Sequence, residues 1–538
     1  DAYYICPIAI TSDNMQKGEI EYQNTFSPIE SVVVPIYEFK DAEITDKILY
    51  TVPASRRVLV ATNAIETGMT IDTLKYCIDT GYVNESQFNP NYGVMMLLNK
   101  SVTQASSQQR RGRVGRKDDG VFYACYTKDT YLKLSPLPIP DIIKSDVTTA
   151  ILDVILNETE TKLEEVLITE FPLNTDGERM PPPDAFQMNN FDQRWYALKQ
   201  TKTFDLSTLV FMQSPAADSF KYALERLRAL GFIDHQCNAT IFGWFASKFR
   251  KVSIENARMI LAGYHHGANV LDLITITCFL QAGHKLGINR NKYVPRNPLG
   301  VSSEEVMLYY KLLFADEFIE YLFIWNDLMD FIEDTTDKLY KSSFKKKRKR
   351  TVQNETDVFH GSGSNNTSLL SKIEQWAELN KFNMDILLRI MSARDELITD
   401  LLNIGMNPFY NGYGLQRGKY NLSNILQTNL NEGMEEVRKI KKCIYEGYRL
   451  NLYIWNESTK SYISAINHNT VTLDSKILKS IDMTNPLDLD FKQSKPQKII
   501  VREVVLRPST VHKGMYEFFG ADISVLDGFV EPDLDYLE

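Results

Sequence analysis

The segment QRRGRVGRKDDG, residues 109–120, places four arginines among the seven positions 110–116 and separates them with two glycines. Guanidinium groups held at fixed spacing suit a polyanion, because each planar fork can donate two parallel hydrogen bonds to a phosphate group. The helix-like SVTQASSQ precedes the segment and the strand-like VFYACYT follows it, so the arginines lie at a helix–turn–strand junction. On its own, such a segment is also typical of an RNA-binding tail or a solvated charged face.

A second polar segment, VLVATNAIETGMTID at residues 58–72, lies about fifty residues upstream. Here an apolar strand ends in Ala-Thr-Asn and leads into a Glu-Thr-Gly turn. Ligands bind at the carboxyl ends of strands in parallel α/β sheets, and hydroxyl and amide groups there can contact phosphate oxygens without adding charge. The two segments together favour a phosphate-binding site more strongly than either does alone.

The elements that must position these segments form an α/β pattern. Short β-branched runs at 31–39, 56–63, 74–82 and 121–127 predict strands. Polar stretches at 40–52 and 102–112 predict helices between them. Alternating strands and helices favour a layer with a largely parallel sheet. Between the two polar segments, QFNPNYG combines strand-like residues with Asn-Pro-Asn and Gly turn chemistry, which predicts a β-hairpin at about 83–100.

From residue 141 to about 410 the sequence is mostly helical, with apolar residues at three-to-four spacing. The clearest helical stretches are 146–156, 218–236, 316–334 and 383–403. After about residue 433 the sequence becomes β-rich, and several short strands at close spacing predict a small barrel.

The basic run KKKRKR, followed by polar sequence, predicts a disordered loop at about 342–368. A nuclear-localisation signal, non-specific phosphate contacts and a merely solvated loop all remain open for this run.

Composition sets broad limits on function. The chain has 538 residues, is 43% hydrophobic and carries a net charge of −9, which is typical of a multidomain globular protein. The net charge argues against bulk coating of nucleic acid, but it allows binding in a local groove. No apolar run is long enough to cross a membrane, so we expect no membrane partner. The six cysteines form no CxxC pair or Cys/His cluster, so no metal site is predicted.

The segments ATNAIETGMTID and QRRGRVGR resemble motifs V and VI of the DEAH-box (DEAH/RHA) branch of superfamily 2 RNA helicases. The resemblance extends over most of the chain. It is of the viral type, similar to the nucleoside triphosphate phosphohydrolase II group of poxviruses and to relatives in African swine fever virus. Motif V reads NAIETG here, where the cellular branch usually reads NIAETS, so the details of this turn differ.

The resemblance implies a multidomain fold of α/β, mostly α and small β-barrel parts. We expect a second RecA-like domain at 1–140, truncated at its N-terminus and including the hairpin. A winged-helix domain at 141–250, a helical ratchet domain at 251–410, and an oligonucleotide-binding (OB) fold with a C-terminal tail at 411–538 would follow. In the family, the hairpin projects between nucleic-acid strands as a wedge.

The resemblance also implies a nucleotide site. Arg113 and Arg116 would be the arginine fingers that face the triphosphate, and Gln109 would orient the attacking water or contact the γ-phosphate. The cofactor would be ATP or another NTP with Mg²⁺. Further contacts to the cofactor are expected from Arg110, which would support the cluster, and from Gly68, Thr70, Asp72 and Tyr50. Tyr50 would stack on the base, although an ordinary core tyrosine remains open.

Contacts to nucleic acid are expected from two regions of the chain. The motif V residues Thr62, Asn63 and Thr67 would touch the backbone of the strand. In the β-rich end, Lys441, Lys442 and Arg449 are candidates, because OB folds hold single strands with basic and aromatic side chains. The expected partner is RNA, single-stranded or duplex with a 3′ overhang. DNA remains open, since nothing in the sequence recognisably reads the 2′-hydroxyl.

The sequence contains neither a Walker A loop nor a DExH segment, which a working NTPase of this class requires. We therefore expect the first RecA-like domain to lie outside this chain and the chain alone to hydrolyse no NTP. The predicted function is the C-terminal half of an NTP-dependent RNA helicase that translocates 3′→5′, within the host cytoplasm or a virion. A non-enzymatic RNA-binding scaffold and a DNA helicase are the alternatives.

Overall fold

The computed structural model divides the chain into two compact units, residues 1–85 with 99–139 and residues 86–98 with 140–538. The residues that the structure describes are 31–36, 56–61, 63, 66, 74–116, 118–157, 213–249, 251–282, 316–343, 364–404, 406–408, 422, 425–426, 429–473, 496–508, 516–527, 529–530 and 532. The predicted helix at 40–52 and the predicted disordered loop at about 342–368 lie wholly or largely outside these ranges.

The first unit contains two pairs of parallel strands. Strand β1 (Ser31–Ile36) pairs with β2 (Arg56–Ala61), and β3 (Tyr76–Asp79) pairs with β6 (Val121–Ala124). All four lie within the segments that the β-branched runs predict, and their parallel pairing agrees with the expected α/β layer.

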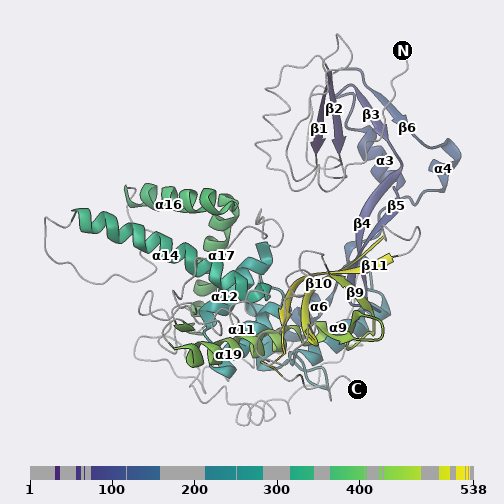
Figure 1. Ribbon diagram of the computed structural model, residues 1–538. Helices are drawn as coiled ribbons and strands as arrows, with labels where there is room; N and C mark the ends of the chain where they lie inside the picture. Colours follow the sequence, from purple (N-terminus) through teal and green to yellow (C-terminus); the bar gives the residue numbers. More distant parts are fainter. Residues whose placement is uncertain are drawn as a thin grey trace. The chain divides into compact units, whose positions relative to one another are not determined.

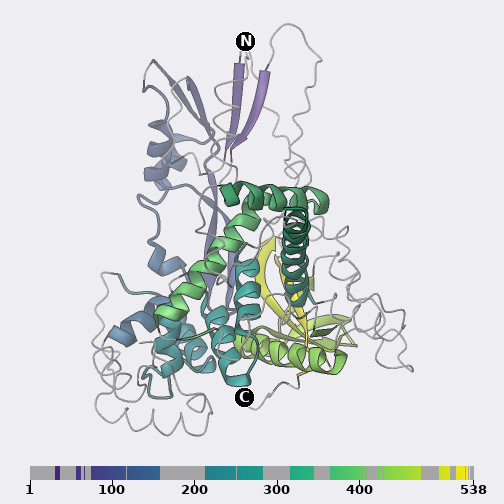
Figure 2. The same cartoon turned by 90° about the vertical axis from the view of Figure 1, so that its left-hand side faces the viewer.

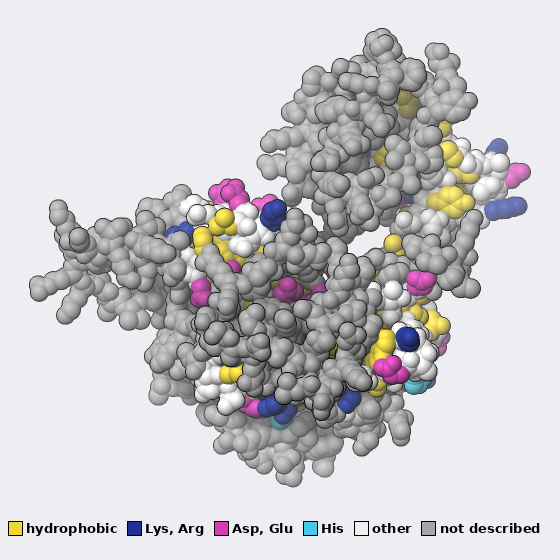
Figure 3. Space-filling view, in the orientation of Figure 1, with side chains coloured by type: hydrophobic (Ala, Val, Ile, Leu, Met, Phe, Trp, Pro, Cys, Tyr) yellow, Lys and Arg dark blue, Asp and Glu magenta, His cyan; other side chains and the backbone are white. Residues whose placement is uncertain are grey.

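Helix α3 (Gln104–Arg111) lies within the predicted 102–112 helix of the first unit and carries the start of the arginine segment. Thr103 caps it by accepting a hydrogen bond from the backbone N–H of Ser106, and Arg110 and Arg111 occupy its last turn. Basic residues are favourable there, because the last turn carries the negative end of the helix dipole. Helix α4 (Lys128–Lys133) follows strand β6. Figure 3 shows hydrophobic side chains at the surface of the region that carries β6 and α4, where Tyr123 and Leu132 are exposed.

The hairpin predicted at 83–100 is present as β4 (Tyr82–Asn89) and β5 (Val94–Ser101). Its tip, residues 86–98, belongs to the second unit, where Met95 and Met96 of β5 pair in parallel with β10. The ring of Phe88 lies 5.2 Å from that of Tyr222. Gly93 has a φ of +64°, and a Cβ there would lie 2.4 Å from the Tyr222 hydroxyl, so the turn requires glycine.

Most of the described residues of the second unit are helical. A first group comprises α5 (Asp141–Lys144), α6 (Thr148–Asn157), α9 (Ala217–Ala229), α10 (Ile241–Lys248), α11 (Ile254–His266) and α12 (Val270–Ala282). A second group comprises α14 (Glu317–Ser343), α16 (Ser364–Asn380), α17 (Met384–Asn403) and α19 (Leu430–Tyr448).

Helix α12 is buried nearly throughout, and α11, α14 and α17 pack against it to form the main hydrophobic core. A helix that is apolar all round is stable only in such a surrounded position. None of the helices in the described part of the chain is long and apolar enough to span a bilayer.

The strands of the second unit follow α19 and the short 3₁₀ turn η7 (Arg449–Asn451). They are β7 (Leu452–Asn456), β8 (Ser461–Ser464), β9 (Thr470–Leu473), β10 (Lys498–Pro508) and β11 (Tyr516–Val525). The sheet order is β11-β9-β8-β7-β10-β5-β4, and the additional pairing of β11 with β10 closes the five strands β7–β11 into a ring. Helices α14 and α19 contact this ring (Figures 1 and 2).

The expectation of a β-rich sequence from about residue 433 needs correction at its start. Residues 430–448 form helix α19, and the strands begin only at Leu452. The physical reason is the apolar spacing in this segment, since Val437, Ile440 and Ile444 recur at helical intervals and are fully buried.

Candidate active site

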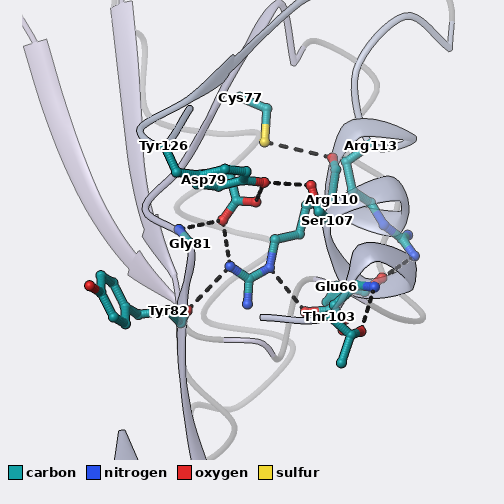
Figure 4. Close-up of polar contacts among 11 residues, drawn as sticks. Glu66, Cys77, Asp79, Gly81, Tyr82, Thr103, Ser107, Arg110, Arg113 and Tyr126 are labelled. Atoms are coloured by element: carbon teal, nitrogen blue, oxygen red, sulfur yellow. Dashed lines mark hydrogen bonds and ion pairs between the residues drawn. The ribbon is translucent and has the colours of Figure 1, made fainter. Parts of the chain in front are cut away.

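The two polar segments of the sequence meet in the first unit. Glu66, in the loop after β2, contacts two arginines of the arginine segment with two different groups. Its carboxylate accepts a hydrogen bond from Nε of Arg110 at 3.0 Å, and its backbone carbonyl accepts one from Nη2 of Arg113 (Figure 4). The backbone N–H of Glu66 donates to the carbonyl of Asn63 at 2.9 Å. This hydrogen bond closes the turn that contains Glu66.

Arg110 is further held by the end of strand β3. Its Nη1 atom donates to Oδ1 of Asp79 at 2.7 Å and to the carbonyl of Tyr82 at 3.3 Å (Figure 4). The side chain of Arg110 is only 16% exposed, so this cation is enclosed among protein acceptors. Burial lowers the pKa of Arg110, but the hydrogen bonds to Asp79 and Glu66 outweigh it and raise the pKa above its ordinary value.

Asp79 has a full set of partners. In addition to Arg110, its Oδ1 accepts from the backbone N–H of Gly81 at 3.0 Å, and its Oδ2 accepts from the hydroxyl of Tyr126 at 2.7 Å. Burial raises the pKa of Asp79, but the hydrogen bonds from Gly81, Tyr126 and Arg110 together lower it below its ordinary value. The carboxylate is therefore ionised at neutral pH although its side chain is 0% exposed.

Tyr126 and Ser107 complete the polar network. The Tyr126 hydroxyl lies 2.5 Å from Oγ of Ser107, which is one turn before Arg110 on α3. Burial raises the pKa of Tyr126 to about 12, so the phenol stays protonated and can donate to Asp79. The thiol of Cys77 donates to the carbonyl of Arg110 at 3.6 Å, and burial raises its pKa, so this cysteine is not a reactive thiolate.

The other residues of the arginine segment are more accessible. Gln109, Arg111 and Arg116 are exposed, and Arg113 is half-buried. The Nε of Arg116 donates to the carbonyl of Gly112 at 3.2 Å. Gln109 on α3, with Arg113 and Arg116 in the turn after it, therefore presents amide and cationic donors beside one arginine that is fixed in the protein, which is a donor set suited to an anion.

Not every predicted site residue can be placed. Asn63 is exposed next to Glu66. Tyr50, Thr62, Thr67, Gly68, Thr70 and Asp72 lie outside the described residues. Within the described ranges, no group of three or more His, Cys, Asp or Glu side chains is arranged to hold a metal ion.

The candidates in the second unit differ from one another. Lys442 is exposed, whereas Arg449 is half-buried and ion-paired with Glu446. Lys441 is only 1% exposed, and its ammonium donates to Asp316 and to the carbonyl of Val525. The prediction that Lys441 contacts nucleic acid is therefore wrong, because a phosphate would have to displace buried protein partners.

Sequence reasoning missed Glu66, Asp79, Ser107 and Tyr126 as parts of the site. A signal was present for Asp79, which ends the strand YCID. A carboxylate in a buried strand must find hydrogen-bond or ionic partners, so its position marks a network. No local pattern identifies those partners, since Tyr126 lies 47 residues away in the sequence.

Comparison with known proteins adds independent findings. Residues 13–118 match the family described as "Helicase conserved C-terminal domain". The African swine fever virus protein named "Putative RNA Helicase B962L" is 24% identical over 498 residues, which cover 90% of this chain and 43% of the relative. The Schizosaccharomyces pombe protein named "Pre-mRNA-splicing factor ATP-dependent RNA helicase prp22" is 36% identical over 171 residues, covering 31% of this chain and 14% of the relative.

Among solved structures, the Escherichia coli DExH-box NTPase HrpB aligns with a TM-score of 0.48 and 12% identity, covering 94% of this chain and 40% of that chain. The chain spans less than half the length of these relatives.

Proposed function

We propose that the chain is the C-terminal portion of a DEAH/RHA-branch superfamily 2 helicase and supplies part of the motor of an NTP-dependent RNA helicase. It would contribute one side of the NTP-hydrolysing site and part of the RNA path. The whole protein would translocate 3′→5′ along a single strand and unwind duplexes. The African swine fever virus relative supports a virus-encoded protein, which would act in the host cytoplasm or within a virion.

The observation that carries this proposal is the junction of Glu66 with Arg110 and Arg113. It joins the segment that resembles motif V to the segment that resembles motif VI. In a motor of this kind the two segments must act together, because one senses nucleic acid and the other faces the nucleotide. A shared residue between them is the simplest structural basis for such coupling.

Arg113 and Arg116 would act as arginine fingers on the triphosphate. Such fingers stabilise the negative charge that develops on the transferred phosphoryl group and are worth about 10³–10⁵ in rate. Gln109, exposed on α3, would orient the attacking water. The accessible donors around α3 fit this role, since a triphosphate needs several cationic and N–H contacts at once.

The nucleotide, with Mg²⁺, would be bound jointly with a first RecA-like domain that carries a Walker A loop. On this chain the loop after β2 would line the cofactor through Gly68, Thr70 and Asp72, and Tyr50 would stack on the base. The bound Mg²⁺ would neutralise charge on the phosphate oxygens.

The RNA path would run over both units. Thr62, Asn63 and Thr67 would contact the strand next to the motor. We infer that residues 141–250 form a winged helix, 251–410 a ratchet domain and 411–538 an OB fold with a tail. The closed ring β7–β11 supports the last assignment, because OB folds are small five-stranded barrels. Lys442 and Arg449 would contribute phosphate contacts near it.

The test uses the full-length parent protein with Arg113→Ala. RNA-stimulated NTP hydrolysis should fall by about 10³-fold or more, because the charge on the transferred group loses its partner. Binding of single-stranded RNA, measured by fluorescence anisotropy, should be retained. Arg111→Ala is the matched control, since Arg111 is an exposed neighbour on the same helix.

Unchanged turnover in Arg113→Ala would contradict the finger assignment. A wild-type protein that binds RNA but hydrolyses no NTP would favour a scaffold. Unwinding of a DNA duplex in preference to a matched RNA duplex would contradict the RNA assignment.

A further inference from the structure

Arg110 ties helix α3 to three separate segments of the first unit. Its guanidinium contacts Glu66 in the loop after β2, Asp79 at the end of β3, and the carbonyl of Tyr82 at the start of β4. Tyr82 is the first residue of the hairpin. One side chain therefore connects the loop that resembles motif V, the end of strand β3 and the first residue of the hairpin.

The network fixes the orientation of α3 as well as its position. Ser107 and Arg110 lie one turn apart on the same face of the helix. Arg110 binds Asp79 directly, and Ser107 shares the Tyr126 hydroxyl that binds the other oxygen of Asp79. Two anchors on one helical face, both leading to one buried carboxylate, restrict rotation of α3 about its axis.

Arg113 follows three residues after Arg110 and depends on the same loop. Its Nη2 donates to the backbone carbonyl of Glu66, whose carboxylate is held by Arg110. If the ion pair between Arg110 and Glu66 is lost, both the end of α3 and the carbonyl that guides Arg113 lose a restraint. The position of Arg113 therefore depends on a side chain that is itself enclosed.

We propose that Arg110 is a positioning residue that aims Arg113, rather than a ligand of the nucleotide. This inference rests on the proposed function, because it concerns the site at which Arg113 would act. It replaces the expectation that Arg110 contacts the cofactor, since the Nε and Nη1 atoms already donate to protein acceptors. Lysine would not substitute, because a single ammonium lacks the planar fork that reaches two carboxylates at once.

The experiment uses Arg110→Lys in the full-length parent protein. The kcat for RNA-stimulated NTP hydrolysis should fall by about 10- to 100-fold, as expected for a misplaced catalytic group. The KM for NTP should stay unchanged, because no ligand contact is removed. Arg111→Lys, the same exchange at the exposed neighbouring position, should leave both constants unchanged. Asp79→Asn, which keeps the side-chain shape, should reproduce the loss of kcat.

A double-mutant cycle separates positioning from a direct role. If Arg110 acts through Arg113, Arg110→Lys should reduce kcat much less in an Arg113→Lys background than in the wild type. Equal losses in both backgrounds would overturn the inference, and so would a raised KM with kcat intact. Thermal unfolding of each variant identifies any loss of the folded state. If Arg110→Lys is unfolded, the cycle is completed with Asp79→Asn, and the same outcomes apply.

The two proposals fail in different ways. If Arg113→Ala abolishes turnover while Arg110→Lys and Asp79→Asn have no effect, the inference is wrong and the proposed function stands. If the wild-type protein hydrolyses no NTP, the proposed function is wrong and the inference falls with it.

Discussion

Two basic segments of this chain look alike in sequence and are used differently in the structure. In RRGR, which begins in the last turn of α3, Arg110 is enclosed and bound to Asp79 and Glu66, while Arg111 is exposed. In KIKK of α19, Lys441 is buried against Asp316, while Lys442 is exposed. In each segment one cation is a structural partner of a buried carboxylate, and its neighbour is exposed.

The two buried carboxylates differ in what they organise. Asp316 accepts from the backbone N–H groups of Phe318 and Ile319, from Oγ of Ser524 at 2.6 Å and from the N–H of Val525 at 2.9 Å, in addition to Lys441. It joins α14, α19 and β11 within the core of the second unit. The network of Asp79 instead extends through Arg110 and Glu66 to the half-buried Arg113, in the turn after α3. The first network maintains the fold, whereas the second presents a site.

The largest effect is expected at Lys441, because its removal leaves Asp316 buried without a cation. Lys441→Ala should destabilise the second unit by about 3–5 kcal/mol, the usual result of removing one partner of a buried pair. The measurement is the midpoint of chemical unfolding followed by tryptophan fluorescence. Lys442→Ala, at the exposed neighbouring position, should change the free energy of unfolding by less than about 0.5 kcal/mol. Equal effects of the two variants would show that Lys441 is not the structural partner assigned here.

A third buried carboxylate, Asp272 on α12, has a pKa shifted in the opposite direction to the pKa of Asp79. Burial raises the pKa of Asp272, on α12, to about 7, although Arg394 lowers it in part. The folded state therefore holds this proton more tightly than the unfolded state, whose pKa stays near 3.8. The stability that the proton contributes is fully present below pH 3.8 and is lost as the pH rises through about 7.

Asp272→Asn removes this titration. The variant should be more stable than the wild type at pH 8, by on the order of 4 kcal/mol, and the advantage should shrink to on the order of 2 kcal/mol at pH 5. Thermal unfolding at the two pH values measures the difference, since the midpoint rises with stability. An advantage of equal size at both pH values would show that Asp272 does not titrate in this range.

These cases show how much of the structure the sequence could predict. Hydrophobic periodicity identified α17, and a polar stretch between strands identified α3. The β-branched runs identified the parallel strands and turn chemistry identified the hairpin, because each of these signals depends on residues close together in the chain. The burial of Lys441 also had a signal, since it falls on the apolar stripe formed by Val437, Ile440 and Ile444. In the network of Arg110 only Asp79 had a signal. The pairing of Arg110 with Glu66 had none, because Glu66 is 44 residues away in the sequence. Pairing across such distances is set by the packing of whole elements.

The smallest effect is expected at Lys442, whose exposure fits a contact with RNA. A single phosphate contact releases about one counterion, so Lys442→Ala should lower the slope of log K against log salt by about 0.7 for single-stranded RNA. The measurement is an anisotropy titration of the full-length protein at several salt concentrations. Lys442→Arg keeps the charge and should keep the slope. A slope that does not change in Lys442→Ala would show that exposure alone does not place a lysine on the RNA path. The pattern in α19 would then distinguish buried from exposed cations without identifying a ligand. At the end of α3, by contrast, the network of Arg110 also includes Glu66, which holds Arg113.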